Sequence, residues 1–375
     1  MLVALVAVVI LAGLSLSCGN SSSKTPTGPN HKAYVTLPDR GSVLLLNIDG
    51  ATGAITMGSQ TPQVEGTTPT GLALLPSKKF LYAVNSFANT ISIFNVASDG
   101  TLTLSGTPTQ AGGSSPNAAV IDPSGKYLLV TNNSTNDVSV FSIDSGSGAL
   151  SPVGLPVPAN TDPSEILITP SGKFVYVTNP TIGMVTAFSF LNGVLTEVKP
   201  GSPFSSGDGA FGLAVDGSER FLYVANPSAS NLSPFSSTRG NISGFNIDSV
   251  TGALTPILGS PFTSTVGSLP TAITVDPSGR FVYAVTPGSS FAIWCFAISP
   301  TNGQLTAVTS SPFSLTAGGL FALIDPSGNY FYIGGQAGIA GYTYDPSTGV
   351  PTVITGSPFS TGTPPTPPGK MVLSE

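Results

Sequence analysis

The chain has 375 residues, of which 8% are charged and 40% are hydrophobic, and its net charge is −6 with only 12 Lys and Arg residues. So few cations exclude a nucleic-acid-binding protein, which needs a basic surface against the phosphates. The 44 glycines and 34 prolines are typical of low-complexity sequence, but the apolar fraction is large enough for a packed core, so we expect a folded protein.

Residues 1–17 are predicted to be a signal peptide, because an apolar run at 2–16 is too short for a comfortable transmembrane helix. The run leads into Ser17 and Cys18, and a small residue before a cysteine resembles the processing site of bacterial lipoproteins. This pattern predicts export to the cell envelope. The protein is expected to be anchored to a bacterial membrane by a lipid on Cys18, or to be periplasmic. An uncleaved anchor is the alternative. Residues 18–31, rich in Ser, Asn, Thr, Pro and Gly, are predicted to be a flexible tether.

The remaining residues, 32–375, are built on a repeat. One copy, at residues 272–285, has a short apolar run, the turn Asp-Pro-Ser-Gly, and a second run rich in aromatic and β-branched residues. Pro and Gly favour a tight turn, so each copy is predicted to be a β-hairpin. The aromatic residue that opens the second strand recurs every 47 to 60 residues, at Phe80, Tyr127, Phe174, Phe221, Phe281 and Tyr330, with a degenerate copy around Tyr34. A period in this range indicates a solenoid or a propeller.

A second turn in each copy, such as Thr251-Gly252-Ala253-Leu254, follows an alternating run and predicts two more strands. Four strands per copy, named a to d from the centre outward, are typical of propeller blades. The first copy has no strand a, whereas residues 368–375 form an orphan strand. We therefore predict an all-β, seven-bladed propeller in which the C-terminal strand completes the N-terminal blade.

The predicted mouth of the central channel contains two unexpected charges. The third residue of strand a is small or apolar in five blades, but it is Glu165 in the fourth blade and Lys370 in the closing strand. A charge near a low-dielectric channel is costly unless it is paired or solvated. These two residues are therefore predicted to bind a polar ligand; the alternative is solvated charges in a water-filled funnel. The ends of the middle strands add Asn132, Asp137 and Asn179 as ligand-binding candidates.

Two further features are predicted to be structural. A Ser-Pro-Phe motif follows the outer strand in four blades, and its Phe is predicted to wedge between neighbouring blades. Cys295 lies in an interior strand and is predicted to be a buried thiol without a chemical role. The sequence has no metal-binding or cofactor-binding motif, so no metal or cofactor is expected.

Residues 170–179 read Pro-Ser-Gly-Lys-Phe-Val-Tyr-Val-Thr-Asn, and residues 122–132 are a close variant. With Gly-x-Leu-Thr and Ser-Pro-Phe, the chain resembles the lactonase family of seven-bladed propellers with YVTN-type repeats, which includes 6-phosphogluconolactonase-like proteins. The resemblance implies lactone hydrolysis at the channel mouth. There, Glu165 or Asp208 would act as a general base toward water, and Arg40 or Arg239 would stabilise the oxyanion.

These observations leave two functions open. The sequence favours an exported module that binds a small molecule or a protein at the channel mouth and meets the membrane only through its lipid anchor. Lactone hydrolysis is the alternative.

Overall fold

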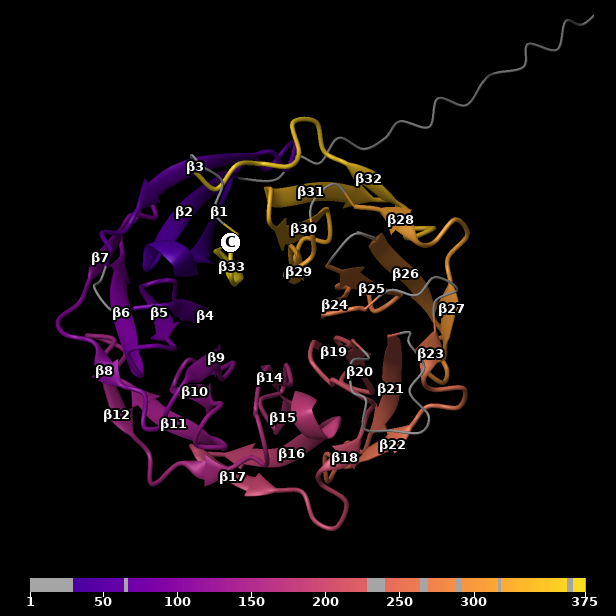
Figure 1. The fold of residues 1–375 in the computed structure, drawn as a ribbon, viewed down its shortest axis with the longest axis horizontal. Helices are drawn as coiled ribbons and strands as arrows, with labels where there is room; N and C mark the ends of the chain where they lie inside the picture. Colours follow the sequence, from indigo (N-terminus) through magenta and orange to yellow (C-terminus); the bar gives the residue numbers. More distant parts are fainter. Residues whose placement is uncertain are drawn as a thin grey trace, which may run out of the picture.

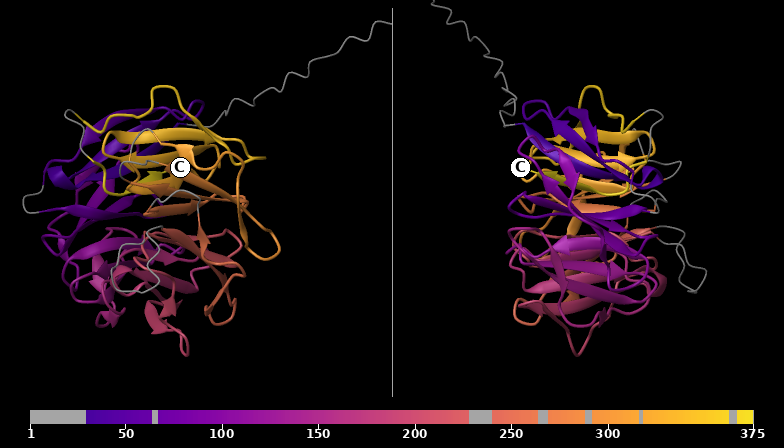
Figure 2. Two further views of the ribbon diagram at one scale, coloured as in Figure 1. Left: turned by 45° about the vertical axis from the view of Figure 1, so that its right-hand side comes forward. Right: turned by 90° about the vertical axis from the view of Figure 1, so that its left-hand side faces the viewer.

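The protein is described here by a computed structural model that covers residues 30–63, 67–227, 240–263, 269–287, 292–315, 318–362 and 367–374. The predicted signal peptide, Cys18 and nearly all of the predicted tether lie outside these residues. Within them, the strands form seven antiparallel sheets that stand radially around a central axis (Figure 1). The molecule has the shape of a thick disc, as the edge-on view on the right of Figure 2 shows. The described residues contain no helix that is long and apolar enough to cross a membrane.

The blades are numbered along the chain, and the strands of each are given from the centre outward. Blade 1 consists of β33 (Met371–Ser374), β1 (His31–Leu37), β2 (Ser42–Ile48) and β3 (Ile55–Gln60). Blade 2 consists of β4 (Pro69–Leu74), β5 (Phe80–Asn85), β6 (Thr90–Val96), β7 (Leu102–Leu104) and the added β8 (Thr109–Gln110). Blade 3 consists of β9 (Pro116–Ile121), β10 (Tyr127–Asn132), β11 (Asp137–Ile143), β12 (Leu150–Pro152) and the added β13 (Val157–Pro158).

Blade 4 consists of β14 (Ile166–Ile168), β15 (Phe174–Asn179), β16 (Met184–Leu191), β17 (Val194–Glu197) and the added β18 (Phe204–Ser205). Blade 5 consists of β19 (Leu213–Val215), β20 (Phe221–Asn226), β21 (Asn241–Ile247), β22 (Leu254–Pro256) and the added β23 (Phe262–Thr263). Blade 6 consists of β24 (Ala272–Val275), β25 (Phe281–Thr286), β26 (Ala292–Ile298), β27 (Leu305–Ala307) and the added β28 (Phe313–Ser314). Blade 7 consists of β29 (Phe321–Ile324), β30 (Tyr330–Gly335), β31 (Gly338–Tyr344) and β32 (Pro351–Val353). Two short 3₁₀ turns, η1 (Pro38–Arg40) and η2 (Pro180–Ile182), lie between strands b and c of blades 1 and 4.

The predicted closure of the ring is confirmed. Strand β33 pairs with β1 and supplies the missing innermost strand of blade 1, so the two ends of the described chain share one sheet (Figure 1). In blades 3, 5, 6 and 7, an aspartate fixes the turn that opens strand b: Asp122, Asp216, Asp276 and Asp325. In blade 6, Oδ1 of the buried Asp276 accepts hydrogen bonds from the backbone N–H groups of Arg280, at 2.7 Å, and Phe281, at 2.6 Å.

The tyrosine of the repeat joins each blade to the next. Its buried hydroxyl donates a hydrogen bond of 2.8–3.0 Å to the carbonyl of a glycine in the c–d turn of the following blade, in the pairs Tyr34–Gly100, Tyr82–Gly148, Tyr176–Gly252, Tyr223–Gly303, Tyr283–Gly349 and Tyr332–Gly53. Blade 3 has Leu129 at this position and makes no such bond. The recurrence of tyrosine in the sequence therefore reflects a hydrogen bond between blades.

The four Ser-Pro-Phe motifs stabilise the outer edge of their blades. Each serine Oγ accepts a hydrogen bond of 3.0–3.1 Å from the backbone N–H of strand c, and the phenylalanine packs against a hydrophobic cluster shared by two blades, at Phe204, Phe262, Phe313 and Phe359. The predicted wedge is confirmed. The motif does not simply follow the outer strand, however. The first three phenylalanines begin the added strands β18, β23 and β28, which pair with the first residues of strand c, whereas strand d pairs with its last residues.

The glycine whose carbonyl accepts this hydrogen bond also lies against an aromatic ring. The ring opens strand b of the blade that carries the tyrosine. Gly252 has φ +75°, and a Cβ there would lie 2.4 Å from Cδ1 of Phe174. Gly252→Ala should therefore lower the free energy of unfolding by about 2–5 kcal/mol, from left-handed strain together with overpacking. Gly154→Ala is the matched control, because Gly154 has φ +72° with no atom within 4 Å of the added methyl group. Chemical denaturation that gave equal losses for both variants would contradict the steric part of this prediction.

Candidate functional site

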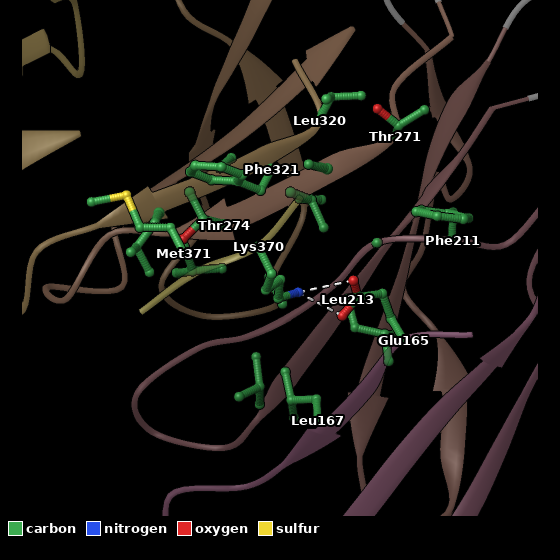
Figure 3. Close-up of a pocket in the computed structure, with 18 residues that line it drawn as sticks. Glu165, Leu167, Phe211, Leu213, Thr271, Thr274, Leu320, Phe321, Lys370 and Met371 are labelled. Carbon is green, nitrogen blue, oxygen red and sulfur yellow. Dashed lines mark hydrogen bonds and ion pairs between the residues drawn. The ribbon is translucent and has the colours of Figure 1, made fainter. Parts of the chain in front are cut away.

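The central channel holds a cavity of about 290 Å³ that opens between the innermost strands of blades 4 to 7 and blade 1. Most of the residues that line it are apolar, and the others include two threonines, one acid and one base. Figure 3 labels the side chains that define it: Glu165, Leu167, Phe211, Leu213, Thr271, Thr274, Leu320, Phe321, Lys370 and Met371. The cavity is large enough for a monocyclic molecule and offers it one region of concentrated charge.

That region is an ion pair between Glu165 and Lys370, which we call the mouth dyad. Nζ of Lys370 donates to Oε1 of Glu165 at 2.9 Å and to Oε2 at 2.8 Å (Figure 3). The side chains are 25% and 33% exposed, so solvent reaches both. The two residues come from blades that are far apart around the ring, and the dyad therefore spans the channel.

The threonine of the repeat holds each member of the mouth dyad by its backbone. In blade 4, the backbone N–H of Glu165 donates to Oγ1 of Thr178 at 3.1 Å, and the N–H of Thr178 donates to the carbonyl of Glu165 at 3.1 Å. In blade 1, the N–H of Lys370 donates to Oγ1 of Thr36 at 2.8 Å, and the N–H of Thr36 donates to the carbonyl of Lys370 at 2.9 Å. Both charged residues immediately precede the regular part of strand a and are fixed by the same device.

The structure gives the polar residues at the ends of strand b other partners. Asn132 is fully buried, and its Nδ2 donates to Oδ1 of Asp137 at 2.7 Å and to Oγ of Ser139 at 2.8 Å. Asn179 is also fully buried, and its Nδ2 donates to the carbonyls of Ala159 and Thr161. These side chains hold the ends of strands within the fold, so we do not place Asn132, Asp137 or Asn179 in the site.

Two of the remaining catalytic candidates, Asp208 and Arg40, lie in mouth loops but outside the cavity wall. Asp208 is half-buried in the loop between β18 and β19, three residues before Phe211, which lines the cavity. Arg40 ends η1 in a mouth loop of blade 1, where a Cβ on Gly362 would lie 2.7 Å from its Nη1. Arg239 lies outside the described residues. The structure thus brings together Glu165 and Lys370 but does not place Asp208 or Arg40 in the same cavity.

Sequence reasoning missed two parts of this site. Thr36 and Thr178 were not identified, although both end a Tyr-Val-Thr sequence whose repetition could have indicated them. The direct contact of the two charges was also missed, because the width of the channel cannot be read from spacing along the chain. Cys295 is fully buried as predicted, and burial raises the pKa of its thiol to about 12, so it stays protonated at neutral pH.

This geometry, a seven-bladed ring with a charged dyad at one mouth, can be compared with known proteins. The sequence profile described as Lactonase, 7-bladed beta-propeller matches residues 27–161 and 239–364. The chain belongs to this lactonase family of propellers. No curated protein matches it.

Several solved structures share the fold. A 6-phosphogluconolactonase-like protein of Bacteroides fragilis is 22% identical with a TM-score of 0.74, over 95% of this chain and 99% of that one. One from Bacteroides uniformis is 19% identical with a TM-score of 0.76, over 92% and 100% of the two chains. The periplasmic gluconolactonase PpgL of Pseudomonas aeruginosa is 18% identical with a TM-score of 0.68, over 92% and 99%. At these identities, the likeness establishes the fold.

Proposed function

We propose that the protein hydrolyses a small lactone at the mouth of its channel. The observation that carries this proposal is the mouth dyad, a carboxylate and an ammonium group in contact at the edge of a cavity of about 290 Å³. Membership of the lactonase family supports it. Ester hydrolysis is accelerated by a base that activates water and by a hydrogen-bond donor for the developing oxyanion, and the dyad supplies one of each.

In the proposed reaction, Glu165 accepts a proton from a water molecule as the water oxygen attacks the lactone carbonyl carbon. Lys370 has three N–H donors, two of which bind Glu165. The third is directed at the carbonyl oxygen and stabilises its negative charge in the tetrahedral intermediate. The bond from the carbonyl carbon to the ring oxygen then breaks. Glu165 returns the proton to the leaving alkoxide, and the product is a hydroxy acid.

The wall of the cavity favours a lactone without a phosphate group. Among the described residues that line it, Lys370 is the one cation, and it would face the carboxylate of Glu165 together with both negative charges of a phosphate. A phosphate dianion in this space would be desolvated without a cation of its own, which is costly. Apolar side chains such as Phe211 and Phe321, with hydroxyls from Thr271 and Thr274, suit an uncharged ring.

The test is a hydrolysis assay with matched neutral and phosphorylated substrates. We expect D-glucono-1,5-lactone, or a neutral alkyl lactone of the same ring size, to have a kcat/KM at least 10-fold above that of the 6-phosphorylated sugar lactone. Faster hydrolysis of the phosphorylated compound would overturn the substrate class but not the reaction. No hydrolysis of any lactone above the spontaneous rate would overturn the reaction.

Binding without catalysis at the same mouth is the second candidate. The mouth dyad places the acceptor oxygens of Glu165 beside the remaining N–H donor of Lys370, so it is also suited to hold a ligand that has donor and acceptor groups side by side. A lactone that binds with 1:1 stoichiometry in calorimetry but is not hydrolysed would favour this function.

We also propose that the protein is exported and lipid-anchored through Cys18, from the apolar run at residues 2–16 and the small residue before the cysteine. Labelling of expressing bacterial cells with a fatty-acid analogue should mark the wild-type protein and not the Cys18→Ser variant. Equal labelling of both would contradict a lipid on Cys18.

A further inference from the structure

A second cavity, of about 500 Å³, lies on the face of the ring opposite the mouth. It is formed by the a–b turns and the starts of strand b in blades 5 and 6, with Pro300 and Ser347 from the c–d turns of blades 6 and 7. We call it the arginine groove, because Arg220 and Arg280 both line it. Strand b has six residues here, so this groove lies roughly 20 Å from the mouth end of the same strands.

The two guanidinium groups are held in place by neighbouring blades. Nη2 of Arg220 donates to the carbonyl of Pro300 at 2.9 Å, and its Cζ lies 4.7 Å from the centre of the Phe221 ring. Arg280 repeats this arrangement one blade further on, with its Nη2 at 3.2 Å from the carbonyl of Ser347 and its Cζ at 5.3 Å from the Phe281 ring. A guanidinium over an aromatic face is an oriented cation.

Neither arginine is neutralised by an ion pair in the described part of the chain. Nη1 of each makes no hydrogen bond to any described residue, so a planar edge of donors remains available on both. This is the geometry with which arginine binds phosphate and carboxylate groups through two parallel bonds.

The carboxylates near the groove are occupied by their own turns. Asp216, which lines the groove, is 4% exposed and accepts the backbone N–H groups of Arg220 and Phe221 at 2.8 and 2.6 Å as well as the hydroxyl of Ser218. Asp276 is bound in the same way. Oδ1 of Asp345 accepts the N–H groups of Ser347 and Thr348. Hydrogen bonds from these turns occupy the carboxylates, whereas Arg220 and Arg280 are exposed in the groove.

The pair is specific to these two blades. The residue before the aromatic that opens strand b is lysine in blades 2, 3 and 4, asparagine in blade 7, and arginine only in the adjacent blades 5 and 6, at positions 79, 126, 173, 329, 220 and 280 respectively. We infer that the arginine groove binds a ligand that carries at least two oxyanion groups, one for each guanidinium, such as two phosphates. A volume of 500 Å³ is larger than a single phosphate requires and accommodates a linked pair.

Calorimetric titration of the full chain at physiological salt tests this inference with inorganic tripolyphosphate and with orthophosphate. We expect tripolyphosphate to bind at least 10-fold more tightly than orthophosphate. The Arg220→Gln/Arg280→Gln variant should lose at least 10-fold in affinity for tripolyphosphate. The Lys126→Gln/Lys173→Gln variant makes the same change of charge at the same strand position in blades 3 and 4, and it should stay within twofold of wild type. Arg220→Lys/Arg280→Lys should be intermediate, because it keeps the charge and loses the planar donors.

A second arm distinguishes the source of the phosphate groups. Sedimentation with phosphatidylglycerol vesicles, against neutral phosphatidylcholine vesicles, reports a lipid headgroup, whereas tripolyphosphate reports a soluble ligand. Arginine-dependent binding in either arm supports the inference and identifies the source. An equal loss of affinity in the lysine control would show that binding depends only on diffuse positive charge, and it would overturn the inference. The absence of binding in both arms, for a wild-type protein with a normal thermal unfolding transition, would also overturn it.

Discussion

A chain that ends at residue 367 is expected to lose the cooperative fold of the ring. The missing residues include β33, whose register with β1 runs from Lys32 opposite Ser374 to Val35 opposite Met371. Met371 is 3% exposed, and Lys370 holds the mouth dyad. Loss of a buried methionine costs about 2–5 kcal/mol, and several strand hydrogen bonds add about 1 kcal/mol each. Together these losses approach the whole stability of a typical domain, about 5–15 kcal/mol. Denaturant unfolding and light scattering should therefore show an unfolded or aggregating chain.

The matched control for this truncation moves the strand instead of removing it. Because Ser374 lies opposite Lys32, the end of β33 is adjacent to the start of β1, and a short Gly-Ser linker can join them as a hairpin. A chain with residues 368–375 placed before residue 30 should recover the unfolding free energy of the wild type. A truncated chain as stable as the wild type would show that β33 adds nothing to the ring. A rearranged chain that is no more stable than the truncated chain would mean that the order of the segments matters, and not only the presence of the strand.

The fold could be predicted because a propeller repeats one local pattern. The turn Asp-Pro-Ser-Gly and the run that follows it encode a hairpin within about 15 residues, and the period of the aromatic residue fixes how many hairpins there are. The hydrogen bonds that join blades were not predicted. Tyr82 and Gly148 are distant in sequence, and a tyrosine in a strand is equally compatible with simple burial in the core.

The site was predictable only where it broke the repeat. Glu165 and Lys370 were identified because the equivalent positions are small or apolar, and the structure places them in one ion pair. Asn132 and Asn179 follow the repeat, and their amides bond within the fold. A polar residue that recurs in several blades is therefore more informative about how a blade is built, whereas an isolated exception is more informative about the channel.

Replacing Glu165 by glutamine is expected to lower kcat for lactone hydrolysis by about 10²–10⁴-fold, the usual effect of removing a general base. Glutamine keeps the size of the side chain and can still accept a hydrogen bond from Lys370, so the free energy of unfolding should change little. Lys370→Met should also lower kcat, by about 10²–10³-fold, because the oxyanion loses its donor. Both values come from steady-state kinetics with a neutral lactone.

A merely structural ion pair makes a different prediction, and exchanging the two residues separates the cases. The Glu165→Lys/Lys370→Glu variant keeps one carboxylate and one ammonium group in the channel. Its free energy of unfolding should therefore be close to that of the wild type and higher than that of either single charge reversal. Its base and its cation are displaced to opposite sides of the cavity, so hydrolysis should remain at least 10²-fold below wild type. Full activity in the exchanged variant would show that the position of the base is unimportant. Full activity in Glu165→Gln would show that Glu165 is not the base. Asp208 would then be the candidate, and the Asp208→Asn variant should lose activity.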